Sequence, residues 1–496
     1  MLSTSKNTLY LLIGYTYQKI ASLVYFIFLA RYLGVENFGK YNFAISFTSL
    51  FIIIVDFAFT LVLTREIARD KEKIKSYLGN VLFFKIIAAV FSVFLIFVLS
   101  KILNFPSDTT KLIYLSILVV ILDSFANSFY GAFRGIMDMR FESLGLILHK
   151  TTMVLMGFIF MKMNLSLVFM MLPMVLGSVV YFLNALIFFR QKLGFWPKPV
   201  FENKTFKFLF NLMLPFFGAT VFSQIFLNIG PVLLSFLGND ESVGYFSAAN
   251  KIPMAVVALV GGAFGAALYP SFSYWFIQDK SRLKGLFKDG LFYLILIFMP
   301  IVIGGLILSQ DLINFIYGKE YLPAALTFSV LFLALPFQLI DYLIIGLLNA
   351  TEKQKTNFKI RIAATICFII FNIILIPKFL DLGVSISFLI SALLIFVLEW
   401  IWLRQFLSLK LNSFLKKIFL VLLASLLMGG GVYFLKERFH FLIVVLCGII
   451  IYGSLIFLFR LVKKDDIYNL FLGKRGGQWE KEGDSPQKRT FQNPHK

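Results

Sequence analysis

Apolar residues fill this chain in about fourteen runs, separated by short polar stretches. About 20 apolar residues, rising about 1.5 Å each in a helix, cross the hydrocarbon core of a bilayer, which is about 30 Å thick. The pattern therefore predicts an all-α polytopic membrane protein with about fourteen transmembrane helices. The predicted spans are 9–30, 41–63, 79–103, 112–133, 144–162, 167–189, 208–237, 244–276, 286–309, 325–349, 358–377, 383–403, 417–435 and 440–461.

The composition supports this fold class. The chain is 59% hydrophobic with a mean hydropathy of +0.85, whereas soluble domains are roughly 45–50% apolar. The first run lacks a small-residue cleavage site and many further runs follow it, so we interpret it as a span rather than a signal peptide. Cys367 and Cys447 lie in apolar runs without metal-ligand spacing, and the three histidines are scattered. We therefore expect neither a disulfide nor a metal site.

The charge distribution predicts the orientation of the chain in the membrane. When the N-terminus is placed in the cytoplasm, most of the 47 Lys and Arg residues fall in loops or tails on that side. The positive-inside rule then predicts a multi-pass protein of the cell (inner) membrane with both termini cytoplasmic. This distribution accounts for the net charge of +21 by topology and anionic lipid headgroups, without a nucleic-acid partner. Because the loops are short, we expect no soluble catalytic domain and no enzyme activity.

A motif that follows the first predicted span returns after the seventh. The first copy is Leu33-Gly34 with Phe38-Gly39-Lys40-Tyr41, and the second is Leu237-Gly238 with Val243-Gly244-Tyr245-Phe246. Six spans separate the copies, an even number, so both keep one orientation and predict parallel repeats about an axis along the membrane normal. The predicted organisation is two pseudo-symmetric six-helix bundles at 1–204 and 205–404, a terminal helix pair at 405–465 and a disordered cytoplasmic tail at 466–496.

Three segments of the N-terminal region resemble a known family. They are Ala30 to Tyr41 (ARYLGVENFGKY), Asp56-Phe57-Ala58 and Thr64-Arg65-Glu66-Ile67-Ala68. Their order is similar to the signature of Wzx-like polysaccharide flippases of the multidrug/oligosaccharidyl-lipid/polysaccharide exporter superfamily. Ala58 stands where that family usually has glycine. The resemblance implies two bundles around a central cavity, alternating access, and an oligosaccharide linked to undecaprenyl diphosphate as cargo.

Single lysines occur inside several predicted spans. A charged side chain in the hydrocarbon core is costly unless it faces protein or water, so these lysines are candidates for contacts with an anionic headgroup. The candidates are Lys19, Lys251, Lys85 and Lys150. Two alternatives remain for these lysines. They could form buried ion pairs, or their aliphatic stems could extend the ammonium groups to the membrane–water interface. Neighbouring polar residues expected to line the cavity near the sugars are Tyr15, Gln18, Gln224, Asn228 and Asn250.

Acidic residues and one histidine also lie within or near the spans. Asp56, Asp123, Asp341 and His149 are candidates either for structural ion pairs or for coupling to H⁺ or Na⁺. For Asp56 the interpretation is a partner for Arg65 or a neighbouring lysine. The sequence contains no nucleotide-binding motif, so an ion gradient or downstream consumption of the cargo would supply the energy.

These observations lead to a flippase hypothesis. A cationic cavity would replace the water around the diphosphate while the polyprenyl tail stays in lipid. Membrane lipids and polysaccharide polymerase or assembly proteins are the further partners expected. One alternative is a multidrug or metabolite cation antiporter of the same superfamily. A different class, a membrane-embedded polymerase or glycosyltransferase, would need a larger outer loop with convergent acid and base groups. A scaffold protein would leave the buried charges unexplained.

Overall fold

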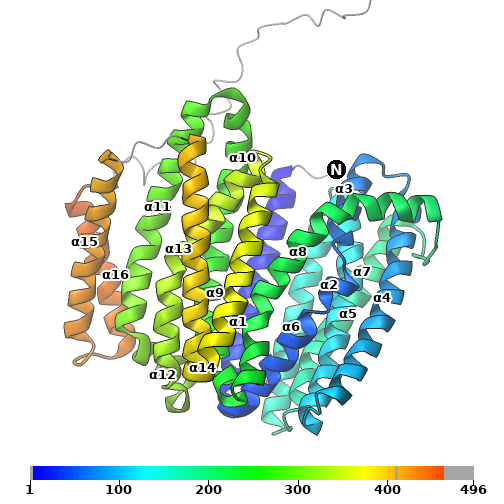
Figure 1. Cartoon of the computed structure of the whole chain (residues 1–496), viewed down its shortest axis with the longest axis horizontal. Coiled ribbons are helices and arrows are strands. Elements are labelled where there is room, and N and C mark those ends of the chain that lie inside the picture. Colours follow the sequence, from blue (N-terminus) through cyan, green and yellow to red (C-terminus); the bar gives the residue numbers. More distant parts are fainter. Residues whose placement is uncertain (1–3, 408–411, 463–496) are drawn as a thin grey trace, which may run out of the picture. The chain divides into compact units, whose positions relative to one another are not determined.

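The computed structural model describes residues 4–407 and 412–462, and every regular element in these ranges is helical (Figure 1). The predicted tail at 466–496 lies outside the described residues. The long helices are α1 (Thr4–Ser49), α4 (Ile74–Ile102), α5 (Ser107–Gly135), α6 (Arg140–Lys162), α7 (Leu172–Leu193), α8 (Asn203–Leu237), α9 (Asp240–Val256), α10 (Gly262–Gln278), α11 (Lys280–Ile307), α13 (Ala324–Ala350), α14 (Gln354–Leu407), α15 (Asn412–Leu435) and α16 (Phe441–Leu458). The shorter elements are α2 (Ile52–Val55), α3 (Phe59–Arg69), α12 (Ser309–Tyr317), the 3₁₀ turns η1 (Phe169–Met171) and η3 (Lys319–Tyr321), and the π turn η2 (Val257–Gly261).

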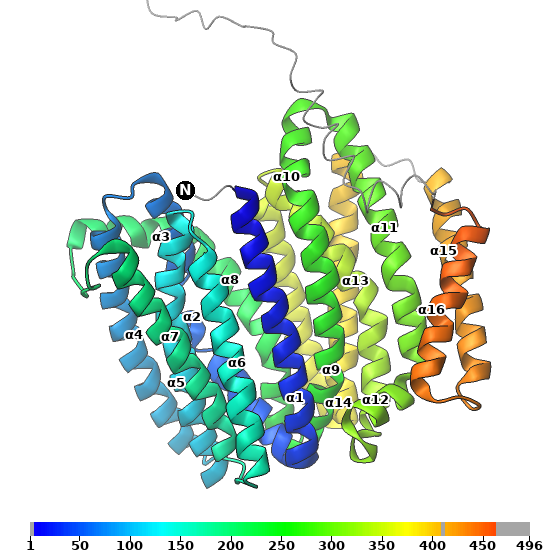
Figure 2. The same cartoon turned by 180° about the vertical axis from the view of Figure 1, so that it is seen from behind.

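Twelve helical segments of the described chain are long and apolar enough to cross a membrane. Two of them, Lys6–Val55 and Gln354–Leu407, would be about 75–80 Å long if straight, more than twice the thickness of the hydrocarbon core. Each is interrupted by a non-helical residue, Gly34 (φ 71°, ψ 174°) in α1 and Leu380 (φ 50°, ψ −126°) in α14. Figure 2 shows the chain turning at the lower end of α1. With these reversals, the prediction of an all-α polytopic protein with about fourteen crossings is confirmed.

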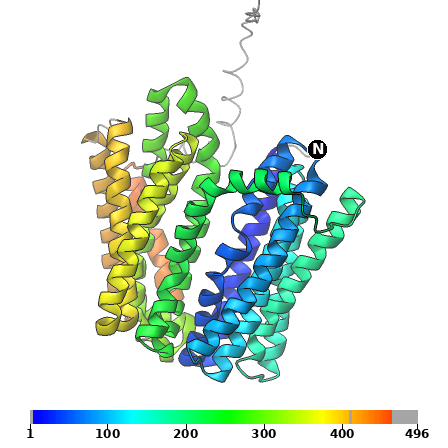
Figure 3. The same cartoon turned by 45° about the vertical axis from the view of Figure 1, so that its right-hand side comes forward.

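The helices of the N-terminal half pack mainly on one another, α1 on α6, α6 on α7, and α5 on α3, α4 and α7. In the C-terminal half, α13 packs on α9, α10 and α14, and α14 packs on α8. Two elements join the halves. The second part of α1 lies along α9, and α8 contacts α3 and α4 as well as α9 and α14. Figure 3 shows α8, in green, bending as it passes from one set of helices to the other.

Within the described chain, residues 4–294 and 305–407 form one compact unit that contains both halves. In the second unit, α15 packs on α16, and the Tyr452 hydroxyl donates a hydrogen bond of 2.7 Å to the carbonyl oxygen of Leu296 in the middle part of α11. The domain boundaries drawn from the sequence at 204–205 and 404–405 stay predictions.

The second predicted span, 41–63, is not one continuous helix. α1 ends at Ser49, the short α2 follows, and α3 begins only at Phe59. Between α2 and α3, Phe57 (φ 46°) and Ala58 (φ 61°) adopt left-handed backbone conformations. Residues with a Cβ atom rarely adopt this conformation, and glycine adopts it freely. A glycine at position 58, as in the family that the signature resembles, would fit this backbone conformation without strain.

Candidate functional site: a cavity lined by both halves

A cavity of about 1190 Å³ lies among α1, α8, α9, α10, α13 and α14. The N-terminal half contributes one face of α1, with Lys19, Ser22, Leu23 and Phe26, and the C-terminal half contributes the remaining wall. Four cationic side chains and one carboxylate line the cavity, namely Lys19, Lys251, Lys355, Arg361 and Asp341. The rest of the wall is largely aromatic and aliphatic. The lining of the cavity is therefore electropositive and amphipathic.

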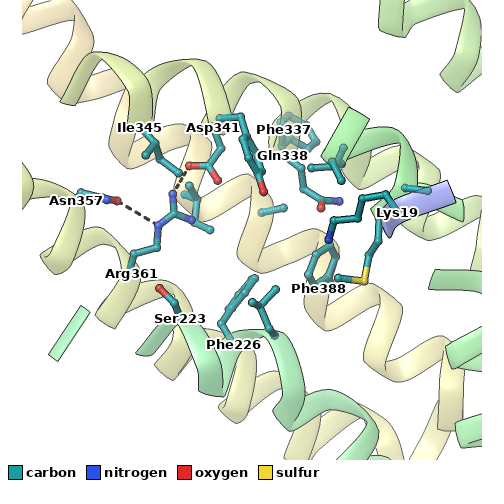
Figure 4. A pocket seen from close by; sticks show the side chains of 18 of the residues that line it. Lys19, Ser223, Phe226, Phe337, Gln338, Asp341, Ile345, Asn357, Arg361 and Phe388 are labelled. Carbon is teal, nitrogen blue, oxygen red and sulfur yellow. Dashed lines mark hydrogen bonds and ion pairs between the residues drawn. The ribbon is translucent and has the colours of Figure 1, made fainter. Parts of the chain in front are cut away.

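Two of the predicted headgroup lysines face this cavity. Lys19 extends from α1 and is exposed, and Figure 4 shows its side chain pointing toward Phe388 of α14. Lys251 of α9 also lines the cavity, with its Nζ 3.9 Å from the centre of the Phe26 ring of α1. A cation over an aromatic face is stabilised by the ring quadrupole, so this contact holds the Lys251 side chain without an ion-pair partner among the described residues. Pro253 and the π turn η2 follow directly, where the regular helical hydrogen bonds are interrupted.

The opposite end of the cavity holds an ion-pair cluster centred on Arg361 (Figure 4). The guanidinium Nη2 donates to Asp341 Oδ1 of α13 and lies 3.5 Å from Glu399 Oε1, while Nε donates to Asn357 Oδ1 at 3.2 Å. Asp341 is thus held in an ion pair here. Arg361 and Glu399 were missed at the sequence level as site residues. Both lie inside predicted spans, 358–377 and 383–403, so the presence of an ionisable residue within a span is the sequence signal that could have identified them.

A second cavity of about 350 Å³ shares Lys251, Leu227 and Met254 with the first. Its polar lining consists of amides and hydroxyls apart from Lys251. Three of the five residues predicted to lie near the sugars, Gln224, Asn228 and Asn250, line this cavity together with Asn42, Ser46 and Ser49 of α1. Neutral amides and hydroxyls are the side chains that exchange hydrogen bonds with sugar hydroxyls at little desolvation cost.

Other candidate residues lie elsewhere. Lys85 lines neither cavity. Its side chain is 0% exposed, and its Nζ donates to Asp56 Oδ1 and to the carbonyl oxygen and Oγ of Ser124, at 2.7 and 2.9 Å for the latter two. The predicted lysine partner of Asp56 is therefore Lys85, and this ion pair lies beside the helix break at Phe57 and Ala58.

Lys150, His149 and Asp123 form a buried polar cluster within the N-terminal half. Lys150 Nζ lies 3.4 Å from His149 Nε2, and the His149 ring stacks on Tyr181 at 5.0 Å. Asp123 Oδ1 is buried without a hydrogen-bond partner among the described residues. None of the three lines either cavity.

Tyr15 and Gln18 also lie outside both cavities. The Tyr15 hydroxyl donates to Glu142 Oε1 at 2.8 Å, and Glu142 in turn accepts from Arg134 Nε at 2.8 Å. Within the described residues, no group of three His, Cys, Asp or Glu side chains is arranged to hold a metal ion.

Comparison with known proteins gives a consistent family. The family model described as "Polysaccharide biosynthesis protein" matches residues 4–276, more than half of the chain. The chain is 22% identical over 400 residues to a capsular polysaccharide biosynthesis protein, CapF, of Staphylococcus aureus, covering 78% of this chain and 96% of that protein. It is 25% identical over 416 residues to a putative O-antigen transporter of Escherichia coli (strain K12), covering 82% and 97%.

Among solved structures, the lipid II flippase MurJ in an inward closed conformation superposes with a TM-score of 0.76. The match covers 91% of this chain and 98% of MurJ at 20% sequence identity, which shows a shared fold. The N-terminal signature, the helical architecture and these similarities agree. The chain belongs to the polysaccharide biosynthesis protein family and is a Wzx-like member of the multidrug/oligosaccharidyl-lipid/polysaccharide exporter superfamily.

Proposed function

We propose that this protein is a flippase that moves an oligosaccharide linked to undecaprenyl diphosphate across the cell membrane through its cationic cavity. The observation that carries the proposal is the convergence of Lys19, Lys251 and Arg361 on one cavity from helices of both halves. The family membership and the transporters and flippases among its relatives support a transport role rather than an enzymatic one.

The physical problem for such a cargo is its charged head. An isolated ion loses tens of kcal/mol of hydration in hydrocarbon by a simple Born estimate, so a bare diphosphate does not cross a bilayer. Ammonium and guanidinium groups around the cavity replace that hydration, and the amide-lined second cavity offers hydrogen bonds to the sugars. The polyprenyl tail remains in lipid during the passage.

The contacts between the halves indicate which side is closed, given the predicted orientation with cytoplasmic termini. On the predicted outer side, Arg31 of α1 donates to the carbonyl oxygens of Ile316 and Phe315 at the end of α12, at 2.6 Å to the former. The Tyr321 hydroxyl donates to the carbonyl oxygen of Ala30 at 2.8 Å. Gln354, Lys355 and Asn357 lie at the predicted cytoplasmic end of the cavity. Export then requires the α1 contacts to part as the halves rock.

The energy source is proposed to be an H⁺ or Na⁺ gradient or the consumption of the cargo by a polysaccharide polymerase or assembly protein outside. A cation antiporter, the same-class alternative, would need an anionic binding cavity. Four cations and one carboxylate line this cavity, and the carboxylate is paired with Arg361, so the lining favours an anionic cargo.

The test uses a bacterial strain that lacks its own flippase for the matching polysaccharide. Lys19→Ala and Lys251→Ala are expected to abolish surface glycan while the protein inserts into the membrane at wild-type level, and lipid-linked precursor is expected to accumulate. Lys101→Ala, an exposed lysine at the end of α4, is the matched control and is expected to complement fully. Full complementation by both cavity variants would remove the proposed headgroup site.

A further inference from the structure

Asp341, Arg361 and Glu399 form a cluster with unequal numbers of positive and negative groups. Both carboxylates approach the same guanidinium nitrogen, Nη2 of Arg361. The side chain of Glu399 is 0% exposed, that of Asp341 is 12% exposed and that of Arg361 is 16% exposed. Arg361 and Asp341 line the cavity, whereas Glu399 is not part of its wall and lies behind Arg361.

Glu399 depends on Arg361 for its charge. Neither of its carboxylate oxygens receives a hydrogen bond from a donor among the described residues, and its ion pair with Arg361 is longer than a hydrogen bond. The Asp341 carboxylate lies close to Glu399 and adds a like charge. A buried carboxylate that loses its compensating cation takes up a proton instead of keeping an uncompensated charge. The same does not hold for Asp341, because it lines the cavity and remains accessible to water.

The other groups facing the cluster do not replace Arg361. Tyr342 of α13 and Asn357 of α14 are neutral, and α8 presents Ser223 from across the cavity (Figure 4). The remaining cations of the cavity are Lys355 on α14, Lys251 on α9 and Lys19 on α1, and no ion pair joins any of these three lysines to Glu399. The charge state of Glu399 therefore follows the position of the Arg361 guanidinium.

Arg361 is also the group in the cavity best suited to a diphosphate. A guanidinium binds phosphate oxygens through two parallel N–H donors, a geometry that a lysine ammonium lacks. We propose that an anionic headgroup entering the cavity draws Arg361 away from the two carboxylates, and that Glu399 then takes a proton from the solvent. Binding of the headgroup and binding of one proton are thereby linked, and a proton accompanies the cargo. This inference rests on the proposed function, because it requires a diphosphate in the cavity.

Calorimetry on the purified full chain tests the linkage with farnesyl diphosphate as the probe. Titrations at neutral pH in buffers of different ionisation enthalpy count the protons bound with the ligand. Wild type is expected to take up about one proton more than Glu399→Gln, which carries a permanently neutral side chain. Asp341→Asn keeps Glu399 and is expected to retain the extra proton. Glu72→Gln, an exposed residue of the loop before α4, is the matched control and is expected to behave as wild type.

Infrared difference spectroscopy on wild type gives a readout that needs no variant. A new carbonyl band of a protonated carboxylic acid is expected when farnesyl diphosphate binds, since the ligand itself has no carboxyl group. Binding without this band, or equal proton uptake by wild type and Glu399→Gln, would overturn the inference and leave the flippase proposal standing. Failure of wild type to bind farnesyl diphosphate at all would count against the headgroup site itself, and the proton linkage would fall with it.

Discussion

Gly39 of α1 and Gly244 of α9 lie at one crossing where the two sequence repeats contact each other backbone to backbone. A Cβ atom added at Gly39 would lie 1.8 Å from the carbonyl oxygen of Asp240, and one added at Gly244 would lie 2.1 Å from the carbonyl oxygen of Val35. Val35 and Asp240 are separated by the same sequence offset as the two glycines. The same contact is thus made twice, as expected when equivalent segments meet across a local two-fold axis.

Alanine at either glycine of this crossing is expected to impair the protein. The added methyl group would overlap backbone atoms, so α1 and α9 must separate, at an expected cost of about 1–3 kcal/mol in stability. Thermal unfolding in detergent measures the loss, and glycan export in the flippase-deletion strain measures its consequence. Gly285→Ala, where nothing lies within 4 Å of the added atom, is the control. Wild-type melting of Gly39→Ala would contradict the close crossing.

Because Lys85 forms an ion pair with Asp56, loss of the Lys85 side chain is expected to lower the stability of the protein rather than its binding of cargo. Lys85→Ala leaves Asp56 without its cation, and loss of one partner of a buried pair costs about 3–5 kcal/mol, less here because Asp56 is 21% exposed. The double variant Asp56→Asn with Lys85→Met removes both charges and is expected to recover part of the stability. A headgroup role for Lys85 gives the opposite result, in which export is lost at unchanged melting temperature and the double variant recovers nothing.

Ala58→Gly is expected to stabilise the protein. Ala58 has a left-handed backbone (φ 61°, ψ 11°), which disfavours residues with a Cβ atom by roughly 1–2 kcal/mol, and the greater entropy of unfolded glycine offsets part of that gain. The net gain is expected to be about 0.5–1 kcal/mol, measured as a higher melting temperature. Ala363→Gly in the regular part of α14 serves as the comparison and is expected to lower it. A lower melting temperature for Ala58→Gly would show that the left-handed turn is not formed.

Asp138, in the loop between α5 and α6, predicts a dependence of stability on pH. It accepts hydrogen bonds from Arg140 at 2.9 and 3.0 Å and pairs with Lys192 at 3.2 Å. The hydrogen bonds from Arg140, followed by those from Lys192, lower the pKa of this carboxyl group. Because the folded pKa lies below the unfolded one, the stabilisation is present above the unfolded value of about 3.9 and is lost as pH falls through the folded pKa.

Asp138→Asn is therefore expected to melt at a lower temperature than wild type at neutral pH, by the equivalent of about 1 kcal/mol or less because both cations are partly exposed. The difference is expected to shrink as the pH is lowered below about 4, where the carboxyl group of the unfolded chain takes up a proton, and to be lost below the lower pKa of the folded protein. Melting curves of both proteins at several pH values provide the measurement. A difference that does not vary with pH would contradict the linkage.

Much of the fold could be predicted because, in a bilayer, a sufficiently long apolar run has to form a membrane-spanning helix, and such runs can be read directly along the sequence. A run such as 79–103 must be helical and must span, whatever packs beside it, since its backbone polar groups have no other partner in hydrocarbon. This rule fails at 41–63. The segment is apolar on both sides of Asp56, but the helix is interrupted there. The break lies beside the ion pair of Asp56 with Lys85, a contact between residues far apart in the sequence that no run of apolar residues reveals.

In the candidate site, too, the sequence predicted some features and the tertiary structure decided others. Lys85 and Lys251 both occur inside predicted spans, yet the Lys85 ammonium group is buried against the Asp56 carboxylate, whereas that of Lys251 lies over the Phe26 ring beside a cavity. Arg361 and Glu399 belong to different arms of α14 and meet only because the chain reverses at Leu380. The amino-acid sequence by itself determined the helical membrane fold, the repeat and the family, because hydrophobic length and local motifs act along the chain. Tertiary structure alone decided which charges face the cavity and which neutralise one another, because pairing and access to water depend on the helices that pack against each residue.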